Sequence, residues 1–297
     1  MTRVIAIGEC MVELSQAGEG LLRRRFAGDA YNTAVYLKRA RPDIGVSFLT
    51  VTGDDPLSLQ MRQAWAAEGV EDDLAFVDPA RRPALYLIET DAAGERRFHY
   101  WRGESAARGW FRALMAAGGA SALAGADLVY VSGISLAILP PEELAAAFRL
   151  LQGRPAGVRL AFDPNLRPVL WGSLGAARGC LEAMAGIADI LLPSRQDLAA
   201  LLGLDDPAAQ MQRLIALGAR EAATTAEADD CLVWDGRELR ALTPPRATVV
   251  DTSGGGDSFN GAYLAARLTG ADPFTAAAEG LDLAARVVGQ RGALIDA

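Results

Sequence analysis

Three consecutive glycines followed by an aspartate form the segment of this sequence best suited to chemistry. They are Gly254, Gly255 and Gly256, with Asp257 directly after them, and residues 255–268 continue with helical periodicity. Glycines at the start of a helix leave backbone N–H groups open, with the positive end of the helix dipole behind them. The segment predicts an anion hole in which Asp257 can accept a proton. An ordinary glycine turn with Asp257 capping the helix is the alternative.

Other reactive residue types are scarce. The sequence contains one histidine, His99, one lysine, Lys38, and three cysteines, Cys10, Cys180 and Cys231, so nearly all of its basic residues are arginine. A histidine-rich zinc site is excluded, and a Ser-His-Asp triad could use only His99. Lys38 follows a leucine, so a lysine-containing phosphate loop is absent. We expect a packing or interface role for His99, packing roles for the cysteines, and chemistry based on carboxylates, backbone amides and arginine.

Composition narrows the possible partners. The chain has 297 residues, of which 51% are hydrophobic, and its net charge of −8 argues against nucleic-acid binding. The long uncharged stretch at 128–141 is too short and too rich in proline to span a bilayer, so no membrane partner is expected. An odd number of scattered cysteines and a carboxylate as early as Glu9 argue against a disulfide framework and a signal peptide. These features predict a cytoplasmic protein.

Short apolar runs alternate with amphipathic segments along most of the chain. This alternation predicts an α/β fold, with a parallel sheet covered by helices on both faces. Asp29 is the expected N-cap of the first helix. The expected strands are 4–7, 46–51, 128–132, 159–162, 190–192 and 248–251, and the expected helices are 29–39, 56–67, 142–151, 174–185, 207–217, 255–268 and 273–288.

Two hairpins interrupt the alternation. Residues 85–90 and 95–101 flank a turn signal at 91–94, and residues 231–235 and 239–242 form a second hairpin expected at a sheet edge. Because side chains alternate along a strand, one face of the first hairpin carries Phe98, Tyr100 and Arg102, and the other carries Arg97, His99 and Trp101. Aromatic residues on both faces predict that each face covers something.

The glycine segment, taken in context, resembles the C-terminal signature of the ribokinase-like (PfkB-type) sugar kinases. Residues 251–265, DTSGGGDSFNGAYLA, correspond to the family pattern D-T-x-G-A-G-D-x-F. Residues 26–34, FAGDAYNTA, resemble the first family motif, G-G-x-x-x-N-x-A, with Ala27 in place of one glycine, and residues 52–56 match a G-x-D segment. The resemblance implies one kinase domain over 1–297, with a three-layer α/β/α sandwich and a small β-sheet lid from about 9–26 and 80–105.

Within this family, three stretches resemble the bacterial kinases of 2-keto-3-deoxygluconate. They are 7–15 (IGECMVELS), 97–102 (RFHYWR) and 163–167 (DPNLR). The resemblance implies phosphorylation of this sugar acid by ATP at its 6-hydroxyl, with Asp257 as general base and the amides of residues 254–256 stabilising the transferred phosphate. It also implies that the substrate contacts Gly28, Asn32, Tyr86, Tyr100, Arg102, Arg167 and Asp257. A guanidinium suits this substrate because it pairs with a carboxylate in a bidentate manner.

The same resemblance implies nucleotide and metal sites. The implied nucleotide contacts are Ser194, Thr225, Glu227, Gly254 and Gly256. Asp197 is the implied ligand for Mg²⁺, while Asp251 and Ser253 are implied to lie near a monovalent cation, K⁺. The chain departs from the family at residues 194–197, where Ser and Asp replace the ends of an N-x-x-E motif, and around Glu227 and Asp230, where relatives carry glycines.

Three functions remain open at this point. The first is 2-keto-3-deoxygluconate kinase, and the second is a fructokinase or another ketose kinase, which would not depend on a substrate carboxylate. The third is a catalytically weak sugar-binding or regulatory protein on the kinase fold, suggested by Ser194, Glu227 and Asp230. Asp257 argues against the third, because a non-catalytic protein needs no proton acceptor there. The hairpin face with Trp101 also predicts a homo-oligomer formed through the lid.

Overall fold

A large twisted sheet forms the centre of the molecule. In the computed structural model, which describes residues 2–90, 96–226 and 229–296, its strands run in the order β13-β12-β11-β10-β9-β8-β1-β4-β5. The strands from β11 to β5 are parallel, and β12 and β13 are antiparallel. Their bounds are β1 (Arg3–Ile7), β4 (Gly45–Thr52), β5 (Ala75–Val77), β8 (Leu128–Ser132), β9 (Arg159–Asp163), β10 (Ile190–Leu191), β11 (Ala222–Ala223), β12 (Cys231–Trp234) and β13 (Leu239–Leu242).

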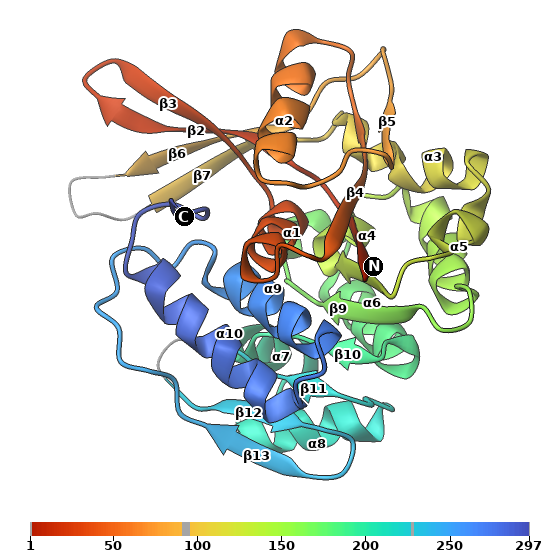
Figure 1. Cartoon of the computed structure of the whole chain (residues 1–297), viewed down its shortest axis with the longest axis vertical. Helices are drawn as coiled ribbons and strands as arrows, with labels where there is room; N and C mark the ends of the chain where they lie inside the picture. Colours follow the sequence, from red (N-terminus) through yellow and green to blue (C-terminus); the bar gives the residue numbers. More distant parts are fainter. Residues whose placement is uncertain (1, 91–95, 227–228, 297) are drawn as a thin grey trace.

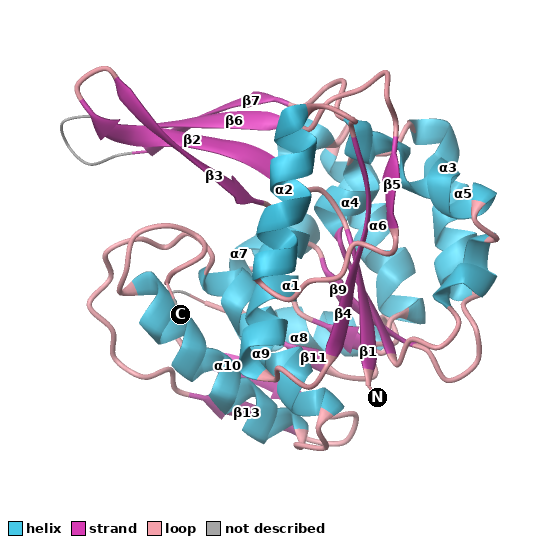
Figure 2. Cartoon of the chain, turned by 45° about the horizontal axis from the view of Figure 1, so that its top comes forward, coloured by secondary structure: helices cyan, strands magenta, loops and turns pink. Residues whose placement is uncertain are grey.

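Helices cover both faces of this sheet (Figures 1 and 2). Strand β1 shows the division, because Val4 and Ala6 pack into one core cluster while Ile5 and Ile7 pack into the other. The first face carries α1 (Asp29–Ala40), α2 (Pro56–Ala67), α9 (Gly255–Leu268) and α10 (Pro273–Val288). The second carries α3 (Trp110–Ala116), α4 (Gly133–Ala137), α5 (Pro141–Gln152), α6 (Leu174–Ile187), α7 (Arg195–Leu202) and α8 (Pro207–Ala216), with short 3₁₀ turns at Ala106–Gly109, Gly119–Leu123 and Pro168–Leu170.

A small second sheet projects from the body (Figure 2). It consists of β3 (Leu21–Ala27), β2 (Met11–Gly18), β6 (Leu85–Thr90) and β7 (Arg96–Trp101), in the order β3-β2-β6-β7. The register places Arg25 opposite Glu13, Glu13 opposite Tyr86, and Tyr86 opposite Tyr100, so these four side chains share one face. The predicted turn at 91–94 lies outside the described residues. The three-layer sandwich with an additional small sheet, expected from the sequence, is confirmed.

Two local predictions are wrong. Residues 248–251 form no strand, because Val249 and Val250 are exposed and the N–H groups of Val250 and Asp251 donate to the Val288 carbonyl at 2.8 and 3.1 Å. The β-branched side chains of Val249 and Val250 predict a buried strand. In the structure, the end of α10 accepts the hydrogen bonds that a neighbouring strand would have accepted. Asp29 is not the N-cap of α1, since Gly28 occupies that position without a side-chain cap and Asp29 lies in the first turn.

Close packing of α1 against α9 brings distant parts of the sequence together. A Cβ atom at Gly261 would lie 2.7 Å from Cβ of Tyr36, so only glycine allows this approach. The contact aligns the first turn of α9 with the first turns of α1. The three cysteines are buried and unpaired, as their expected packing role requires. Among the described residues, no helix is both long and apolar enough to cross a bilayer.

Candidate active site

Asp257 lies in the first turn of α9 and contacts α1. Its Oδ2 accepts a hydrogen bond from Nδ2 of Asn32 at 2.8 Å. Loss of surrounding water raises the pKa of Asp257 to about 7, and the negative charge of Asp29 adds to this shift, whereas Asn32 and the positive charge of Arg167 oppose it. A carboxyl with this pKa can exchange a proton near neutral pH.

The glycine segment before Asp257 forms an open helix terminus. Gly254 is the N-cap of α9 in the left-handed conformation (φ 75°), and no side chain caps the helix. A Cβ at Gly254 would lie 2.3 Å from the Ala293 carbonyl oxygen, whereas a Cβ at Gly256 would meet no described atom within 4 Å. The first-turn N–H groups lack a side-chain acceptor, as in an anion hole, although the Gly255 N–H donates to the Thr252 carbonyl at 3.3 Å.

Two further aspartates, Asp29 and Asp163, lie close enough to Asp257 to affect its surroundings electrostatically, and neither was expected among the site residues. Asp29 accepts a hydrogen bond from Nδ2 of Asn165 at 3.0 Å. Asp163, at the end of β9, accepts from the Asn165 backbone N–H at 2.9 Å and from Nδ2 of Asn260 at 2.8 Å. Burial raises the pKa of Asp163 well above its usual range, and the negative charges of its neighbouring aspartates add to this. Asn165 is held with φ at 33°, the one non-glycine residue with positive φ in the described chain.

The two arginines predicted to bind substrate differ in their surroundings. Arg167 is exposed, and its Nη1 donates to the Leu166 carbonyl at 2.9 Å. Arg102 is largely buried, and its Nη2 donates to Oε2 of Glu9 at 2.5 Å. Ser105 donates its hydroxyl to the other oxygen of Glu9. Burial raises the pKa of Glu9 above its usual range, although Arg102 and Ser105 favour the ionised form. The pairing of Glu9 with Arg102 was not expected from the sequence.

Aromatic side chains lie on the face of the small sheet that carries Tyr86. The rings of Tyr86 and Tyr100 lie 5.7 Å apart, and Phe98 stacks on Tyr100 at 6.3 Å. The hydroxyl of Tyr86 donates to the buried carboxylate of Glu13. At the base of this sheet, a Cβ at Gly28 would lie 2.1 Å from the Glu9 carbonyl oxygen, so glycine is required there. The predicted residues Gly28, Tyr86 and Tyr100 therefore belong to elements that meet beside α1.

The predicted nucleotide residues lie at the start of α7. Ser194 caps this helix, with its Oγ accepting the Asp197 N–H at 3.0 Å, and the Arg195 N–H donates to the Thr225 carbonyl at 2.8 Å. Burial raises the pKa of Asp197, although Arg167 and hydrogen bonds from its surroundings oppose the shift. Glu227 lies outside the described residues. Asp230 accepts a hydrogen bond from the Thr243 hydroxyl at 2.7 Å, which turns its carboxylate toward the sheet edge.

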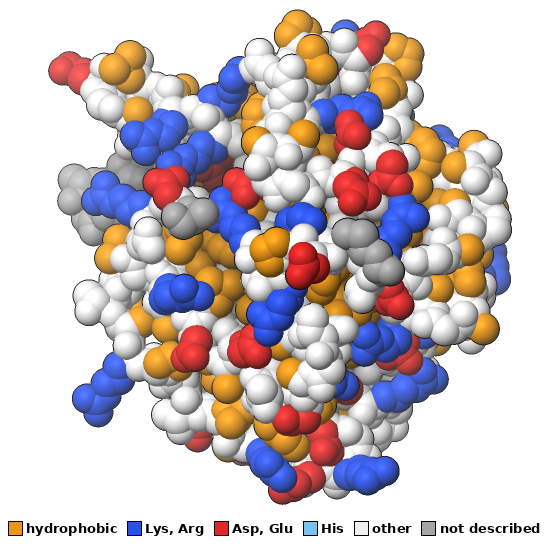
Figure 3. All heavy atoms as spheres, viewed as in Figure 1, with side chains coloured by type: hydrophobic (Ala, Val, Ile, Leu, Met, Phe, Trp, Pro, Cys, Tyr) orange, Lys and Arg blue, Asp and Glu red, His pale blue; other side chains and the backbone are white. Residues whose placement is uncertain are grey.

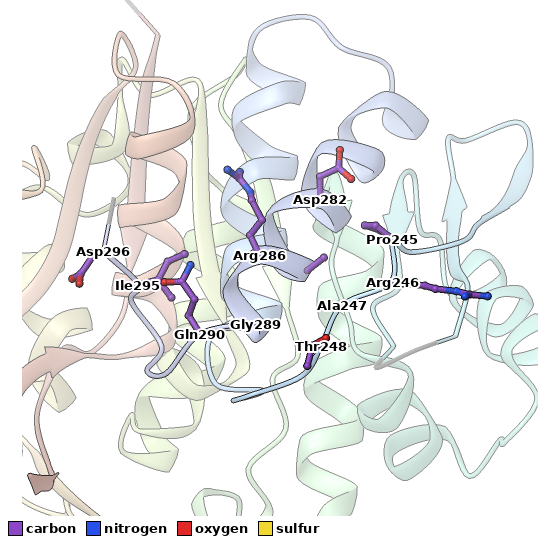
Figure 4. Close-up of a pocket in the computed structure, with 11 residues that line it drawn as sticks. Pro245, Arg246, Ala247, Thr248, Asp282, Arg286, Gly289, Gln290, Ile295 and Asp296 are labelled. Carbon is purple, nitrogen blue, oxygen red and sulfur yellow. The ribbon is translucent and has the colours of Figure 1, made fainter.

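A groove of about 1030 Å³ lies beside the glycine segment. Figure 4 shows residues 245–248 along one side of the end of α10, with Gln290 and Ile295 on the other side. The groove adjoins the segment that carries Asp251, whose buried carboxylate accepts the N–H groups of Ser253 at 2.9 Å and Gly292 at 2.6 Å. The groove is lined by Pro245, Arg246, Ala247, Thr248, Asp282, Ala285, Arg286, Gly289, Gln290, Ile295 and Asp296.

Comparisons with known proteins identify the family of this chain. The sequence pattern of the pfkB family carbohydrate kinases matches residues 1–297. The chain is 39% identical over 300 residues to the 2-dehydro-3-deoxygluconokinase of Escherichia coli (strain K12), covering 99% of this chain and 97% of that protein. It is 40% identical over 299 residues to the 2-dehydro-3-deoxygluconokinase of Dickeya dadantii (strain 3937), covering 98% and 96%. The crystal structure of the PfkB protein from Polaromonas sp. JS666 superposes with a TM-score of 0.86 at 25% identity, covering 98% and 96% of the two chains. The chain therefore belongs to the pfkB family and is a carbohydrate kinase.

Proposed function

We propose that this kinase transfers the terminal phosphoryl group of ATP to the 6-hydroxyl of 2-keto-3-deoxygluconate. The observation that carries the proposal is the position of Asp257, which follows the open helix terminus directly and is held by Asn32 at 2.8 Å. A proton acceptor and an anion hole on adjacent residues are the two groups that in-line phosphoryl transfer to an alcohol requires. The relatives named 2-dehydro-3-deoxygluconokinase support this choice of substrate.

Asp257 acts as the general base in this scheme. With its pKa at about 7, roughly half of the molecules carry the ionised form at neutral pH. Asn32 fixes one carboxylate oxygen, and the other takes the proton of the 6-hydroxyl as its oxygen attacks the phosphorus. The backbone N–H groups of Gly254, Gly255 and Gly256 stabilise the negative charge on the transferred phosphoryl group.

The sugar acid occupies the space between α1, the small sheet and the 163–167 turn. Arg167 binds the substrate carboxylate, because its exposed guanidinium has only a neighbouring carbonyl as a hydrogen-bond acceptor among the described residues. Arg102 contributes the N–H groups that Glu9 does not take, since only its Nη2 donates to that carboxylate. Tyr86 and Tyr100 cover the sugar, and Gly28 and Asn32 form its floor.

The nucleotide lies on the opposite side of the glycine segment. Its phosphates approach Gly254 and Gly256 and the start of α7 at Ser194 and Thr225, with Glu227 in the adjacent segment. Its base enters the groove between residues 245–248 and α10. In this arrangement the nucleotide and the sugar acid meet at Asp257.

Two cations fit the donor set near the nucleotide. Among the described residues, no three Asp, Glu, Cys or His side chains form a metal cluster. Mg²⁺ prefers one or two carboxylates together with phosphate oxygens and water, and we assign Asp197 as the carboxylate that would hold it. The Mg²⁺ would neutralise phosphate charge. Asp251 and Ser253, on the loop before α9, would hold a monovalent cation such as K⁺ beside the anion hole.

The small sheet serves as a lid, formed by segments 9–26 and 80–105 within a single kinase domain of 1–297. The face opposite Tyr86 carries Trp101, which is 60% exposed, and the exposed His99. We assign this face to contact with a second copy of the chain, because an exposed aromatic strand at a sheet edge favours association. A sedimentation profile showing only monomer at micromolar concentration would contradict this assignment.

A coupled assay of ADP release tests the function. The purified protein is supplied with ATP and Mg²⁺ and with a panel that includes 2-keto-3-deoxygluconate, its uncharged ketose analogues, fructose and other keto sugar acids. We expect turnover that depends on the substrate carboxylate. Equal turnover with fructose would favour a ketose kinase, and sugar binding without turnover would favour a regulatory protein.

A further inference from the structure

Strand β3 carries three consecutive arginines that alternate between the two faces of the small sheet. Arg24 lies 5.6 Å from the ring of Phe26 and belongs to the face opposite Tyr86. Arg25 lies opposite Glu13 in the register and belongs to the face that carries Tyr86 and Tyr100. The two neighbours have the same chemistry but point in opposite directions, which makes them a matched pair.

Arg25 reaches the segment that supports the anion hole. A Cβ atom at Gly292 would lie 2.8 Å from Nη1 of Arg25. The Gly292 N–H donates to Asp251, and the next residue, Ala293, packs against Gly254 at the start of α9. Figure 1 shows the C-terminal segment passing below the small sheet, and Figure 3 shows basic side chains gathered over that sheet. The guanidinium of Arg25 thus lies beside the C-terminal loop whose next residue, Ala293, packs against the start of α9.

The guanidinium of Arg25 makes no ion pair within the described chain. The guanidinium is half-buried, and no described residue forms a hydrogen bond or ion pair with it. The carboxylate opposite it, Glu13, instead accepts the hydroxyl of Tyr86. A partly exposed guanidinium whose N–H groups are not taken by the protein can bind a ligand that supplies the opposite charge.

The surrounding site also carries acidic side chains. Burial raises the pKa of Asp163 and Asp257, and the negative charge of Asp29 raises both values further. The carboxyls that are ionised repel the phosphates of a nucleotide. A guanidinium offers a planar set of N–H donors that matches phosphate oxygens.

We propose that Arg25 binds the terminal phosphates of the nucleotide from the small sheet, across from the helix terminus at Gly254. The inference rests on the proposed role of a nucleoside triphosphate as phosphoryl donor, but it does not depend on which sugar accepts the phosphate. It makes the small sheet part of the nucleotide site as well as the sugar site.

Equilibrium binding without sugar tests this proposal. ATP and AMP are titrated by calorimetry into the wild-type protein and into the Arg25→Gln and Arg24→Gln variants. We expect Arg25→Gln to raise the Kd for ATP by about 10-fold, the lower end for a charged hydrogen bond, and to leave the Kd for AMP within about twofold. Arg24→Gln should leave both unchanged. Arg25→Lys keeps the charge without the planar set of donors. This variant should lose less affinity for ATP than Arg25→Gln.

Several results would overturn the proposal. They are an unchanged ATP affinity in Arg25→Gln, an equal loss for ATP and AMP, and a wild-type protein that binds ATP no more tightly than AMP. A defect confined to the KM for the sugar acid would also overturn it, because it would move Arg25 to the sugar site. Failure of the sugar-acid assay together with a selective loss of ATP binding in Arg25→Gln would refute the proposed substrate while supporting this inference. Thermal melting of both variants confirms that they fold.

Discussion

The ionisation of Asp257 can be tested by the pH dependence of the reaction and by one substitution. The pKa of Asp257 is about 7 instead of the usual 3.8. If the ionised form is the base, kcat/KM for the sugar falls about tenfold from pH 8 to pH 6 and about a hundredfold by pH 5. A carboxyl with an ordinary pKa would lose almost nothing over this range. The measurement is initial rates by ADP release, with ATP binding followed in parallel to separate proton effects on the nucleotide.

The Asp257→Asn variant is the second arm of this test. Asparagine can still accept the hydrogen bond from Asn32, but it cannot take a proton, so turnover at pH 8 should fall by at least about a hundredfold. The residual rate of Asp257→Asn should no longer fall between pH 8 and pH 5. Asn32→Ala should move the limb of the profile to higher pH, because Asn32 favours the charged form of Asp257. Near-wild-type turnover in Asp257→Asn, or an acid limb close to pH 4, would refute the reasoning.

The same shift has a consequence for stability. Because the folded pKa of Asp257 exceeds the unfolded value, the native state binds more protons and its free energy of unfolding falls as pH rises from about 4 to about 7. Above pH 7 the cost of this charge is at most about 4 kcal/mol. Asp257→Asn should therefore raise the melting temperature at pH 8 and lose this advantage near pH 4.

Three further predictions concern neighbouring residues. Arg167→Ala should raise the KM for the sugar acid about tenfold or more through loss of a charged hydrogen bond, and should spare ATP; a rise confined to ATP would place Arg167 elsewhere. Asn165→Ala should lower the free energy of unfolding by about 1–2 kcal/mol, because it removes the hydrogen bond to Asp29 and leaves a non-glycine residue at φ 33°. Asn165→Gly should lose less, and equal denaturation midpoints for the two variants would argue against backbone strain. Glu9→Ala should cost about 3–5 kcal/mol by leaving Arg102 buried and unpaired, and urea unfolding should show part of this cost recovered in the double variant with Arg102→Ala.

Most of the fold could be predicted from local patterns. The bounds of α2, α9, α10 and β8 follow from apolar periodicity and from proline or glycine at their starts, and the structure confirms them. The predicted strand at 248–251 is wrong because β-branched residues indicate a strand only where neighbours bury them. Val249 and Val250 are exposed, and the last turn of α10 takes the hydrogen bonds that a strand would have made.

Less of the candidate active site than of the fold could be predicted from the sequence. Asp257 and the three glycines before it could be predicted because they form one continuous sequence motif. Glu9 and Asp163 lie in stretches that resemble the family, but their burial and pairing depend on partners that lie far away in the chain, namely Arg102 and Asn260. A lone carboxylate beside an apolar strand gives no sign of whether it is buried and paired. The position of Arg25 beside Gly292 could not be predicted either, because three adjacent arginines ordinarily indicate a solvated surface.

The attachment of residues 292–295 determines when this site can form during synthesis. Gly292 holds Asp251, Ala293 packs against Gly254 and accepts from the hydroxyl of Tyr36, and the Ile295 carbonyl accepts from Arg39 at 2.5 Å. All strands of both sheets leave the ribosome before these residues do. A nascent chain can therefore assemble its layers while the loop before α9 still lacks its support. Catalytic competence should thus appear only after residues 292–295 have been synthesised, and a transcript truncated before the codon for Gly292 should yield a folded but inactive polypeptide.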